Sequence, residues 1–308
     1  MNIDLEKPSR IRFTKGPLLI VIAALLWGLD GVLRRSLYSL PPINIIFSEH
    51  LFGFCVIAPF AWESFRVSKI KKRDWLTIGL VSLLSGVIGT LFFTTALLST
   101  QFISFSVVYL LQKLQPIFAI STARIFLKEK LHKDFYLWAI LALVSAYFVT
   151  FPNGIINFKT GSGTMVASMF AIGAAFAWGS STTFSKIALK DLEPALTTAL
   201  RFFFTSIIAF FGVIIFGKLS ATVSLSPTQS LTLIAIALST GMVALLIYYK
   251  GLRNTPVSVS TILELFYPLI AVAIDVAVYH NTLFTSQYLA SILLLYSMYR
   301  VSKLTENN

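Results

Sequence analysis

The fold of this chain is decided by the stretch SFSVVYLLQKLQPIFAISTARIFLKEKL, residues 104–131. This stretch is apolar and long enough to cross a bilayer as a helix, yet Gln112, Lys113 and Pro116 stand near its middle. A proline inside a helix cannot donate a hydrogen bond to the carbonyl four residues earlier, so Pro116 leaves the Gln112 carbonyl without its helical partner. The stretch therefore predicts a membrane span that is broken and polar in its middle.

The same arrangement returns at residues 256–283, PVSVSTILELFYPLIAVAIDVAVYHNTL. Pro268 follows Glu264 by the four residues that also separate Pro116 from Gln112. In hydrocarbon an unpaired carbonyl is costly unless protein or cavity water reaches it. The two breaks thus indicate an internal repeat and predict a shared polar site inside a helix bundle.

The composition places the whole chain in a membrane. It is 56% hydrophobic and 12% charged, against roughly 45–50% and 25% in soluble domains. Apolar runs of about 20 residues, the length needed to cross the hydrocarbon layer as a helix, recur along the sequence. We predict an all-α membrane protein with ten transmembrane helices, at about 17–37, 42–62, 75–98, 104–126, 134–152, 163–189, 194–217, 227–249, 256–280 and 284–302.

The positive charge follows the order of these spans. The formal charge is +12, and with a cytoplasmic N-terminus most lysines and arginines fall in cytoplasmic segments. The outer segments then hold only Arg34, Arg35, Lys159 and Lys218. This bias predicts a multi-pass protein of the cytoplasmic membrane whose tails, residues 1–16 and 303–308, are both cytoplasmic. No basic domain with interleaved aromatic residues occurs, so nucleic acid is not an expected partner.

The sequence offers no enzyme motif. Cys55 is the single cysteine, so neither an intrachain disulfide nor a cysteine-based metal site can form. His50, His132 and His280 fall in separate segments, and neither HExxH, Gly-x-Ser-x-Gly nor a phosphate-binding Gly-Lys-Ser/Thr loop occurs. We therefore expect no catalytic residues, no metal and no cofactor. No small-residue cleavage site follows the first apolar run, so we expect it to be a retained span.

The two halves of the chain align span by span. AALLWGLDGVLRRSL of the first span matches GAAFAWGSSTTFSKIAL of the sixth, which pairs Trp27 with Trp178. PINIIFSEHLFG of the second matches PALTTALRFFFT of the seventh, and GVIGTLFFTTAL of the third matches GMVALLIYYKGL of the eighth. These matches set Glu49 opposite Arg201 and Phe93 opposite Tyr248. Five spans is an odd number, so the second half must enter the membrane with opposite polarity, which predicts two inverted five-helix repeats, 17–152 and 163–302.

This order of motifs resembles the EamA-like proteins, the ten-helix branch of the drug/metabolite transporter superfamily. The resemblance runs from about residue 17 to 302 and is carried by the Trp-Gly pair in the first span of each half, the mid-helix proline and the ending Phe-Leu-Lys-Glu-Lys-Leu at 126–131. It implies a central cavity lined by spans 1, 3, 4, 6, 8 and 9, and export of small metabolites or amino acids across a prokaryotic inner membrane. The chain departs from the family pattern at Asn281, the repeat mate of Glu129, and at Glu49, where the family usually has arginine.

Ionisable residues inside the spans are the main candidates for function. Glu264 lies at the carbonyl that Pro268 frees, where a carboxyl could load and unload a coupling proton or balance the charge of a substrate. Lys113 lies one helical turn past Tyr109 and could bind a substrate carboxylate or phosphate. The alternative for both charges is a permanent ion pair between Glu264 and Lys113.

A second group of polar residues lies towards the predicted outer side. Asp30 and Arg34 are four residues apart, which predicts a local ion pair on one helix. Glu49 and His50 are either a proton relay or, as we favour, a structural pair with arginine. Arg201 is expected to brace the inner ends of the spans.

The sequence thus predicts a secondary active transporter, an exporter, that works by alternating access, with proton coupling as a hypothesis. The predicted pocket is shaped by Glu264, Lys113, Gln112, Tyr109, Trp27, Trp178, Tyr248 and Tyr267, although helix packing is an equal interpretation of either tryptophan. Alternatives are an antiporter of anionic metabolites such as sugar phosphates or nucleotide sugars, with Lys113 and Lys250 holding phosphate, an intramembrane enzyme acting on lipid, and a scaffold. The expected partners are a small-molecule substrate and the lipid bilayer, and the expected state is a monomer or a homodimer.

Overall fold

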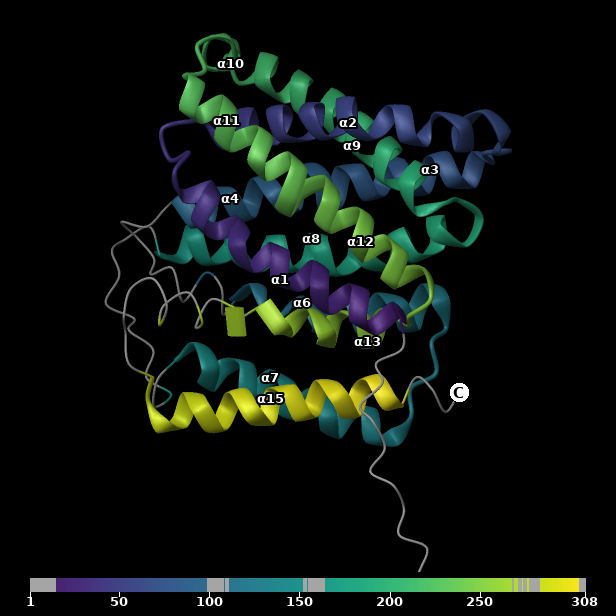
Figure 1. The fold of residues 1–308 in the computed structure, drawn as a ribbon, viewed down its shortest axis with the longest axis vertical. Helices are drawn as coiled ribbons and strands as arrows, with labels where there is room; N and C mark the ends of the chain where they lie inside the picture. Colours follow the sequence, from purple (N-terminus) through teal and green to yellow (C-terminus); the bar gives the residue numbers. More distant parts are fainter. Residues whose placement is uncertain are drawn as a thin grey trace, which may run out of the picture.

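The computed structural model describes residues 15–98, 108, 111–151, 154, 164–267, 269–270, 273, 276 and 283–304. The regular elements in these residues are helices, with no strand among them (Figure 1). The first half holds α1 (Lys15–Arg35), α2 (Pro42–Val67), α3 (Lys72–Val81), η1 (Ser82–Gly89), α4 (Thr90–Leu98), α6 (Gln115–Thr122), η2 (Ala123–Leu127) and α7 (Lys133–Thr150). The second half holds α8 (Thr164–Asp191), α9 (Pro194–Ile215), α10 (Leu219–Val223), α11 (Pro227–Ile236), η4 (Ala237–Gly241), α12 (Met242–Arg253), α13 (Val257–Leu263), η5 (Glu264–Phe266) and α15 (Thr285–Lys303).

Helices occur within each of the ten predicted ranges. In the described residues, six helical stretches are long and apolar enough to cross a membrane: Pro42–Val67, Lys72–Leu98, Lys133–Thr150, Met165–Asp191, Pro194–Ile215 and Pro227–Arg253. The all-helical membrane fold is therefore confirmed, while the number of ten spans stays a prediction. Large apolar side chains on the outside, such as Phe60, Ile215 and Leu289, are more than half exposed, as a surface that faces lipid requires.

The packing of the helices is preserved when the two halves are exchanged. The contact of α1 with α12 corresponds to the contact of α8 with α3, η1 and α4, and the contact of α6 with α8 corresponds to that of α13 and η5 with α1. The pairs α2 with α9, α6 with α13, and α7 with α15 join the halves directly. In Figure 1 corresponding helices, for example α1 and α8, run in opposite directions.

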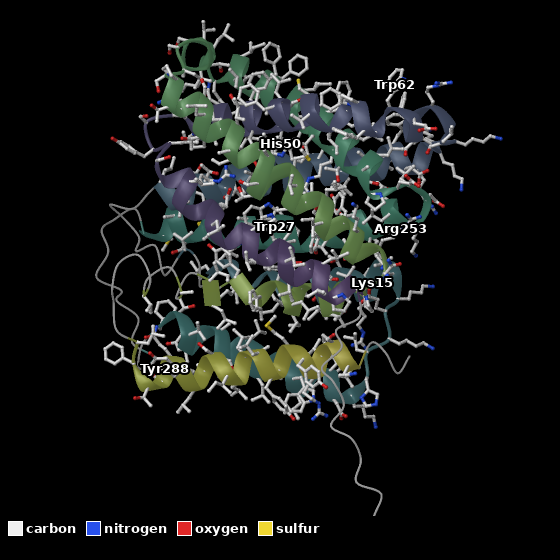
Figure 2. All side chains as sticks on the ribbon, viewed as in Figure 1. Lys15, Trp27, His50, Trp62, Arg253 and Tyr288 are labelled. Atoms are coloured by element: carbon white, nitrogen blue, oxygen red, sulfur yellow. The ribbon has the colours of Figure 1, made fainter. Side chains whose placement is uncertain are left out.

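The ends of the bundle can be followed through a few side chains. Figure 2 shows Lys15, Trp62 and Arg253 towards one end of the helices and Tyr288 at the other, with Trp27 in between. Lys15 begins α1 and Arg253 ends α12, so these neighbouring helices are antiparallel. Trp27, in the middle of α1, therefore lies between the two ends of the bundle.

Two helices of the bundle contain a widened turn at corresponding positions. Residues of η1, in the third span, and η4, in the eighth, form π-helix, whose i→i+5 hydrogen bonds leave some carbonyls without helical partners. The Ser85 carbonyl of η1 accepts instead from Thr90 Oγ1 at 3.0 Å and from Trp178 Nε1 at 3.1 Å. The irregular backbone is thus satisfied by side chains from inside the bundle.

Close packing around η1 depends on glycine. A Cβ added to Gly86 would overlap the Thr205 side chain of α9, and one added to Gly89 would press on the Trp178 ring of α8. Gly79, on the same span, has no atom within 4 Å of the position of such a Cβ. Alanine at Gly86 therefore tests the close packing, whereas alanine at Gly79 reports only the general preference of helices against glycine.

We expect Gly86→Ala to lower the melting temperature of the detergent-solubilised protein, since overpacking a close contact costs about 1–3 kcal/mol. Gly79→Ala should leave the melting temperature unchanged or raise it slightly, because alanine favours helix. A thermal scan of both variants beside the natural protein measures the difference. Equal stability of the two variants would contradict the packing that we describe.

Candidate functional site

A central cavity lies between the two halves and contains most of the residues that the sequence singles out. The predicted residues that line it are Trp27, Asp30, Glu49, His50, Gln112, Lys113, Pro116, Trp178, Tyr248, Glu264 and Tyr267. Tyr109 and Pro268 lie outside the described residues. The lining also includes residues of α2 and α9, the second and seventh spans, which the family resemblance does not place there. Glu49 of α2 reaches inwards beside Gly241, where an added Cβ would lie 3.0 Å from Glu49 Oε1.

The helix break predicted at Pro116 is present. Residues 113–114 form a turn, and α6 begins at Gln115 with Pro116 in its first turn, where a helix needs no N–H from proline. In the second half, α13 ends at Leu263 and continues as the tighter 3₁₀ turn of η5. Both irregular segments contribute side chains to the cavity.

Glu264 is held between the two halves by neutral hydrogen-bond donors. Its Oε2 accepts from Gln115 Nε2 at 2.8 Å, and its Oε1 accepts from the Tyr248 hydroxyl at 2.5 Å. The alternative of an ion pair with Lys113 is wrong: Lys113 Nζ donates to Thr150 Oγ1 and to the Ala146 carbonyl of α7. Lys113 lies at the turn of residues 113–114, and its ammonium group contacts α7 and not Glu264.

Aromatic side chains form two pairs at equivalent positions in the repeats. The ring centroids of Trp27 and Tyr248 lie 5.0 Å apart, and those of Trp178 and Phe93 lie 5.1 Å apart. Each tryptophan packs against a neighbouring helix and also lines the cavity, so packing and a place at the site coexist. The cavity thus has an aromatic pair from each half, and only one of them carries a hydroxyl.

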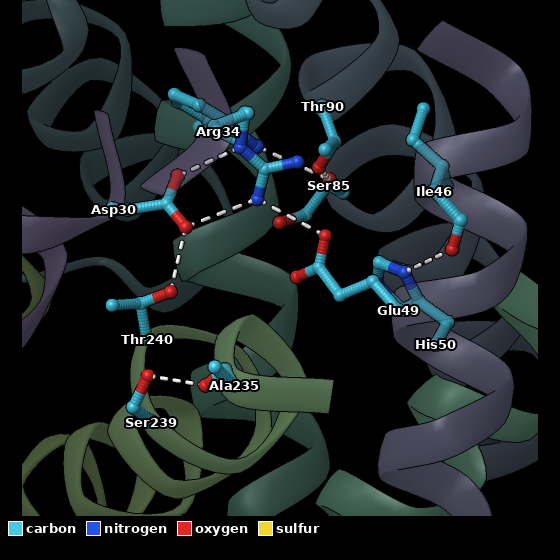
Figure 3. A network of polar contacts seen from close by, with 11 residues as sticks. Asp30, Arg34, Ile46, Glu49, His50, Ser85, Thr90, Ala235, Ser239 and Thr240 are labelled. Atoms are coloured by element: carbon cyan, nitrogen blue, oxygen red, sulfur yellow. Dashed lines mark hydrogen bonds and ion pairs between the residues drawn. The ribbon is translucent and has the colours of Figure 1, made fainter. Parts of the chain in front are cut away.

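An ionic network lies at one side of the cavity (Figure 3). Arg34 Nε lies 2.8 Å from Asp30 Oδ2, which confirms the predicted pair along α1. Arg34 Nη2 also lies 3.0 Å from Glu49 Oε2, and Thr240 of η4 donates to Asp30 Oδ1 at 2.6 Å. The guanidinium therefore joins α1 to α2, and Asp30 joins α1 to the π-helical segment of the eighth span.

His50 does not take part in this network. Its Nδ1 donates to the Ile46 carbonyl at 2.9 Å, and its ring packs against Phe202 with centroids 4.6 Å apart. The structural interpretation of Glu49 as an arginine partner is confirmed. A proton relay between Glu49 and His50 would need a hydrogen bond between them, and none is present among the described contacts.

Arg201, which was expected to brace the inner ends of the spans, lines the cavity. Its Nη1 donates to the Tyr249 hydroxyl at 3.0 Å, and its Nη2 donates to Ser85 Oγ at 2.7 Å. Ser85 and Thr240 directly precede the aligned segments of the third and eighth spans, so each arginine network includes one member of this equivalent pair.

Other lining residues were not singled out from the sequence. Those with hydrogen-bonding groups are Ser85, Thr90, Gln115, Ser181, Thr182, Ser185, Thr240, Tyr249 and Thr261. Serine and threonine are common in membrane helices, so their types alone give no signal. The alignment of Ser85 with Thr240 was the one available signal, because both polar residues stand beside a glycine in each repeat.

Charged residues also fasten the turn between α12 and α13. The Glu129 carboxylate accepts from the Val257 N–H at 2.8 Å and from Ser258 Oγ at 2.7 Å, so it caps the start of α13. Lys186 Nζ donates to the Leu252 carbonyl at 2.6 Å and to the Thr255 carbonyl at 2.9 Å, beyond the end of α12. The acidic residue of the family motif thus has a structural task that joins the halves.

A protein-family model and several known proteins match this chain over most of its length. The model of the EamA-like transporter family matches residues 14–151 and again residues 165–302. The riboflavin transporter ImpX of Fusobacterium nucleatum is 36% identical over 94% of this chain and 98% of its own length. The uncharacterised transporter YwfM of Bacillus subtilis is 24% identical over 92% of the chain and 93% of its own length. A solved crystal structure with 15% identity matches the fold with a TM-score of 0.76, covering 95% of this chain and 99% of that one.

We expect Arg34→Ala to destabilise the protein strongly. The side chains of Arg34 and Glu49 are 4% and 6% exposed, and removing one partner of a buried ion pair costs about 3–5 kcal/mol. Arg73→Ala removes a side chain that is 59% exposed and pairs with Asp191 and Asp74, and it should cost about 0–1 kcal/mol. Unfolding of both variants in detergent, followed by temperature or denaturant, measures the two costs. Similar losses would show that the buried network does not stabilise the fold.

Proposed function

Because the chain belongs to the EamA-like transporter family, we propose that it is a secondary transporter of a flat heteroaromatic solute that carries hydroxyl groups, with riboflavin as the substrate. It is a membrane transporter and not an enzyme. The proposal includes ten spans in two inverted repeats, with both termini in the cytoplasm. Export stays a prediction of the family resemblance.

The observation that carries the proposed substrate is the aromatic lining of the cavity. Trp27 with Tyr248, and Trp178 with Phe93, offer ring faces from both halves, and Tyr267 adds a further aromatic side chain. Flat conjugated rings bind well among such side chains, with polar groups fixing their orientation. The relative that covers nearly the whole chain is named for riboflavin, a molecule with such a ring system.

The two arginine networks, one from each half, support alternating access. One network joins Arg34 to Glu49 and to Asp30, which Thr240 of η4 also contacts, and the other joins Arg201 to Ser85 of η1. The first network is centred on α1 and α2 of the first half, and the second is centred on α9 of the second half, so each half contributes an arginine to the cavity. Opening one while the other stays closed is how a repeat transporter exposes its site to each side in turn.

Glu264 is the residue best placed to couple transport to protons. Its carboxylate contacts an amide and a phenol, and no lysine or arginine pairs with it among the described residues. A buried carboxyl with neutral partners can be neutralised by a proton without breaking an ion pair. Protonation would change its bonds to Tyr248 and Gln115, which belong to different halves.

The two lysines that the anionic-metabolite alternative assigns to phosphate do not favour it. Lys250 is exposed and is not among the cavity-lining residues, and Lys113 Nζ is engaged by Thr150 and Ala146 of α7. Neither lysine is arranged as a free phosphate ligand. We therefore keep riboflavin as the proposed substrate.

Proteoliposomes with an imposed pH gradient test substrate and coupling together. We expect riboflavin flux through the natural protein, accelerated by the gradient and read in both directions. Glu264→Gln should keep riboflavin exchange but lose the acceleration, because an amide cannot carry the proton. The control is Glu63→Gln, an exposed carboxyl outside the cavity, which should behave as the natural protein.

Undiminished gradient-driven flux in Glu264→Gln would remove the coupling role. Absence of riboflavin flux through the natural protein would remove the substrate instead.

A further inference from the structure

Part of the cavity wall has polar atoms that the protein does not satisfy. Among the described residues, four buried polar atoms on lining side chains have no hydrogen-bond partner: Arg34 Nη1, Ser181 Oγ, Arg201 Nε and Thr261 Oγ1. Burying a polar group without a partner is unfavourable, so nearly all such groups in native proteins are paired. Because four of these atoms belong to residues around one cavity, a ligand bound there is the partner that we consider.

Neighbouring hydroxyls show that the helices can satisfy such groups when nothing else is required. Thr182 donates to the Trp178 carbonyl at 3.1 Å, and Ser185 Oγ lies 3.1 Å from the Tyr249 hydroxyl. A serine or threonine within a helix commonly bonds to the carbonyl four residues earlier. Ser181 and Thr261, each 1% exposed, make no such bond and are left for another partner.

The charges around Arg34 define what that partner can be. Its guanidinium is already held by Asp30 at 2.8 Å and by Glu49 at 3.0 Å. A phosphate or carboxylate placed on the remaining N–H would meet two carboxylates of like charge. A neutral oxygen, such as a hydroxyl, can accept this hydrogen bond without that repulsion.

We propose that Arg34, Ser181, Arg201 and Thr261 form a subsite for an uncharged polyhydroxyl chain, which in riboflavin is the ribityl chain. Each hydroxyl of such a chain both donates and accepts, so it can pair with the guanidinium N–H groups and with the protein hydroxyls. The aromatic pairs hold the ring system. This inference rests on the proposed function and extends it, because it names the side chains that select a flavin with a polyol chain.

The experiment compares riboflavin with lumiflavin, which has the same ring system and a methyl group in place of the chain. Binding of each flavin is measured on the full-length protein in nanodiscs. Ser181→Ala and Thr261→Val remove one hydroxyl each with little change of shape. We expect each to weaken riboflavin binding about 3- to 10-fold, the effect of one lost hydrogen bond, and to leave lumiflavin binding unchanged.

Matched controls come from hydroxyls that are equally buried and unpaired but do not line the cavity. Ser180→Ala, next to Ser181, and Thr94→Val remove such groups and should leave the affinity for both flavins unchanged. Arg34→Lys keeps the charge between the carboxylates but lacks Nη1, and should also weaken riboflavin selectively.

The outcomes separate this inference from the proposed function. If the natural protein binds riboflavin and lumiflavin equally, or if the cavity variants weaken both flavins equally, the subsite is wrong and the transporter proposal stands. If the natural protein binds neither flavin, the proposed substrate and the subsite both fail.

Discussion

The structure depends on the rule that every backbone polar group within hydrocarbon needs a partner. The chain leaves regular α-helix at the turn before Pro116 and in the π-helical segments η1 and η4. Side chains meet the Ser85 carbonyl of η1, which accepts from both Trp178 and Thr90. The irregular backbone thus has carbonyls that need polar partners, and polar side chains around the cavity supply them.

The two repeats place residues at matching positions, but the residue types at some of these positions differ and so have different chemistry. Gln112 and Glu264 occupy equivalent places, as do Phe93 and Tyr248, but a carboxylate and a phenol can meet only in the second half. Their hydrogen bond of 2.5 Å has no counterpart in the first, since phenylalanine has no hydroxyl. A symmetric frame that holds one protonatable group can use that group to favour one arrangement of the halves over the other.

Hydropathy and repeated motifs were enough to predict the helical membrane fold, the break at Pro116 and the pair of Asp30 with Arg34, because these follow from local sequence. Side-chain directions at the break were not predictable. At the turn of residues 113–114, Lys113 donates to α7, and Gln115 donates to Glu264. No local sequence pattern indicates these partners. The contact of Arg201 with Ser85 was not predictable for a similar reason, since it joins residues far apart in the chain.

The central claim is that the interior between the repeats is a wet chamber that holds substrate. It is tested most directly by thiol labelling of single cysteines after Cys55→Ser, with a membrane-impermeant reagent in water. Gln112→Cys and Trp178→Cys lie in the cavity lining, whereas Ile117→Cys and Phe176→Cys replace side chains on the same segments that are each 51% exposed on the outside. The account predicts labelling of the first two, slowed by riboflavin, and none of the second two. Labelling only at Ile117→Cys and Phe176→Cys would contradict it.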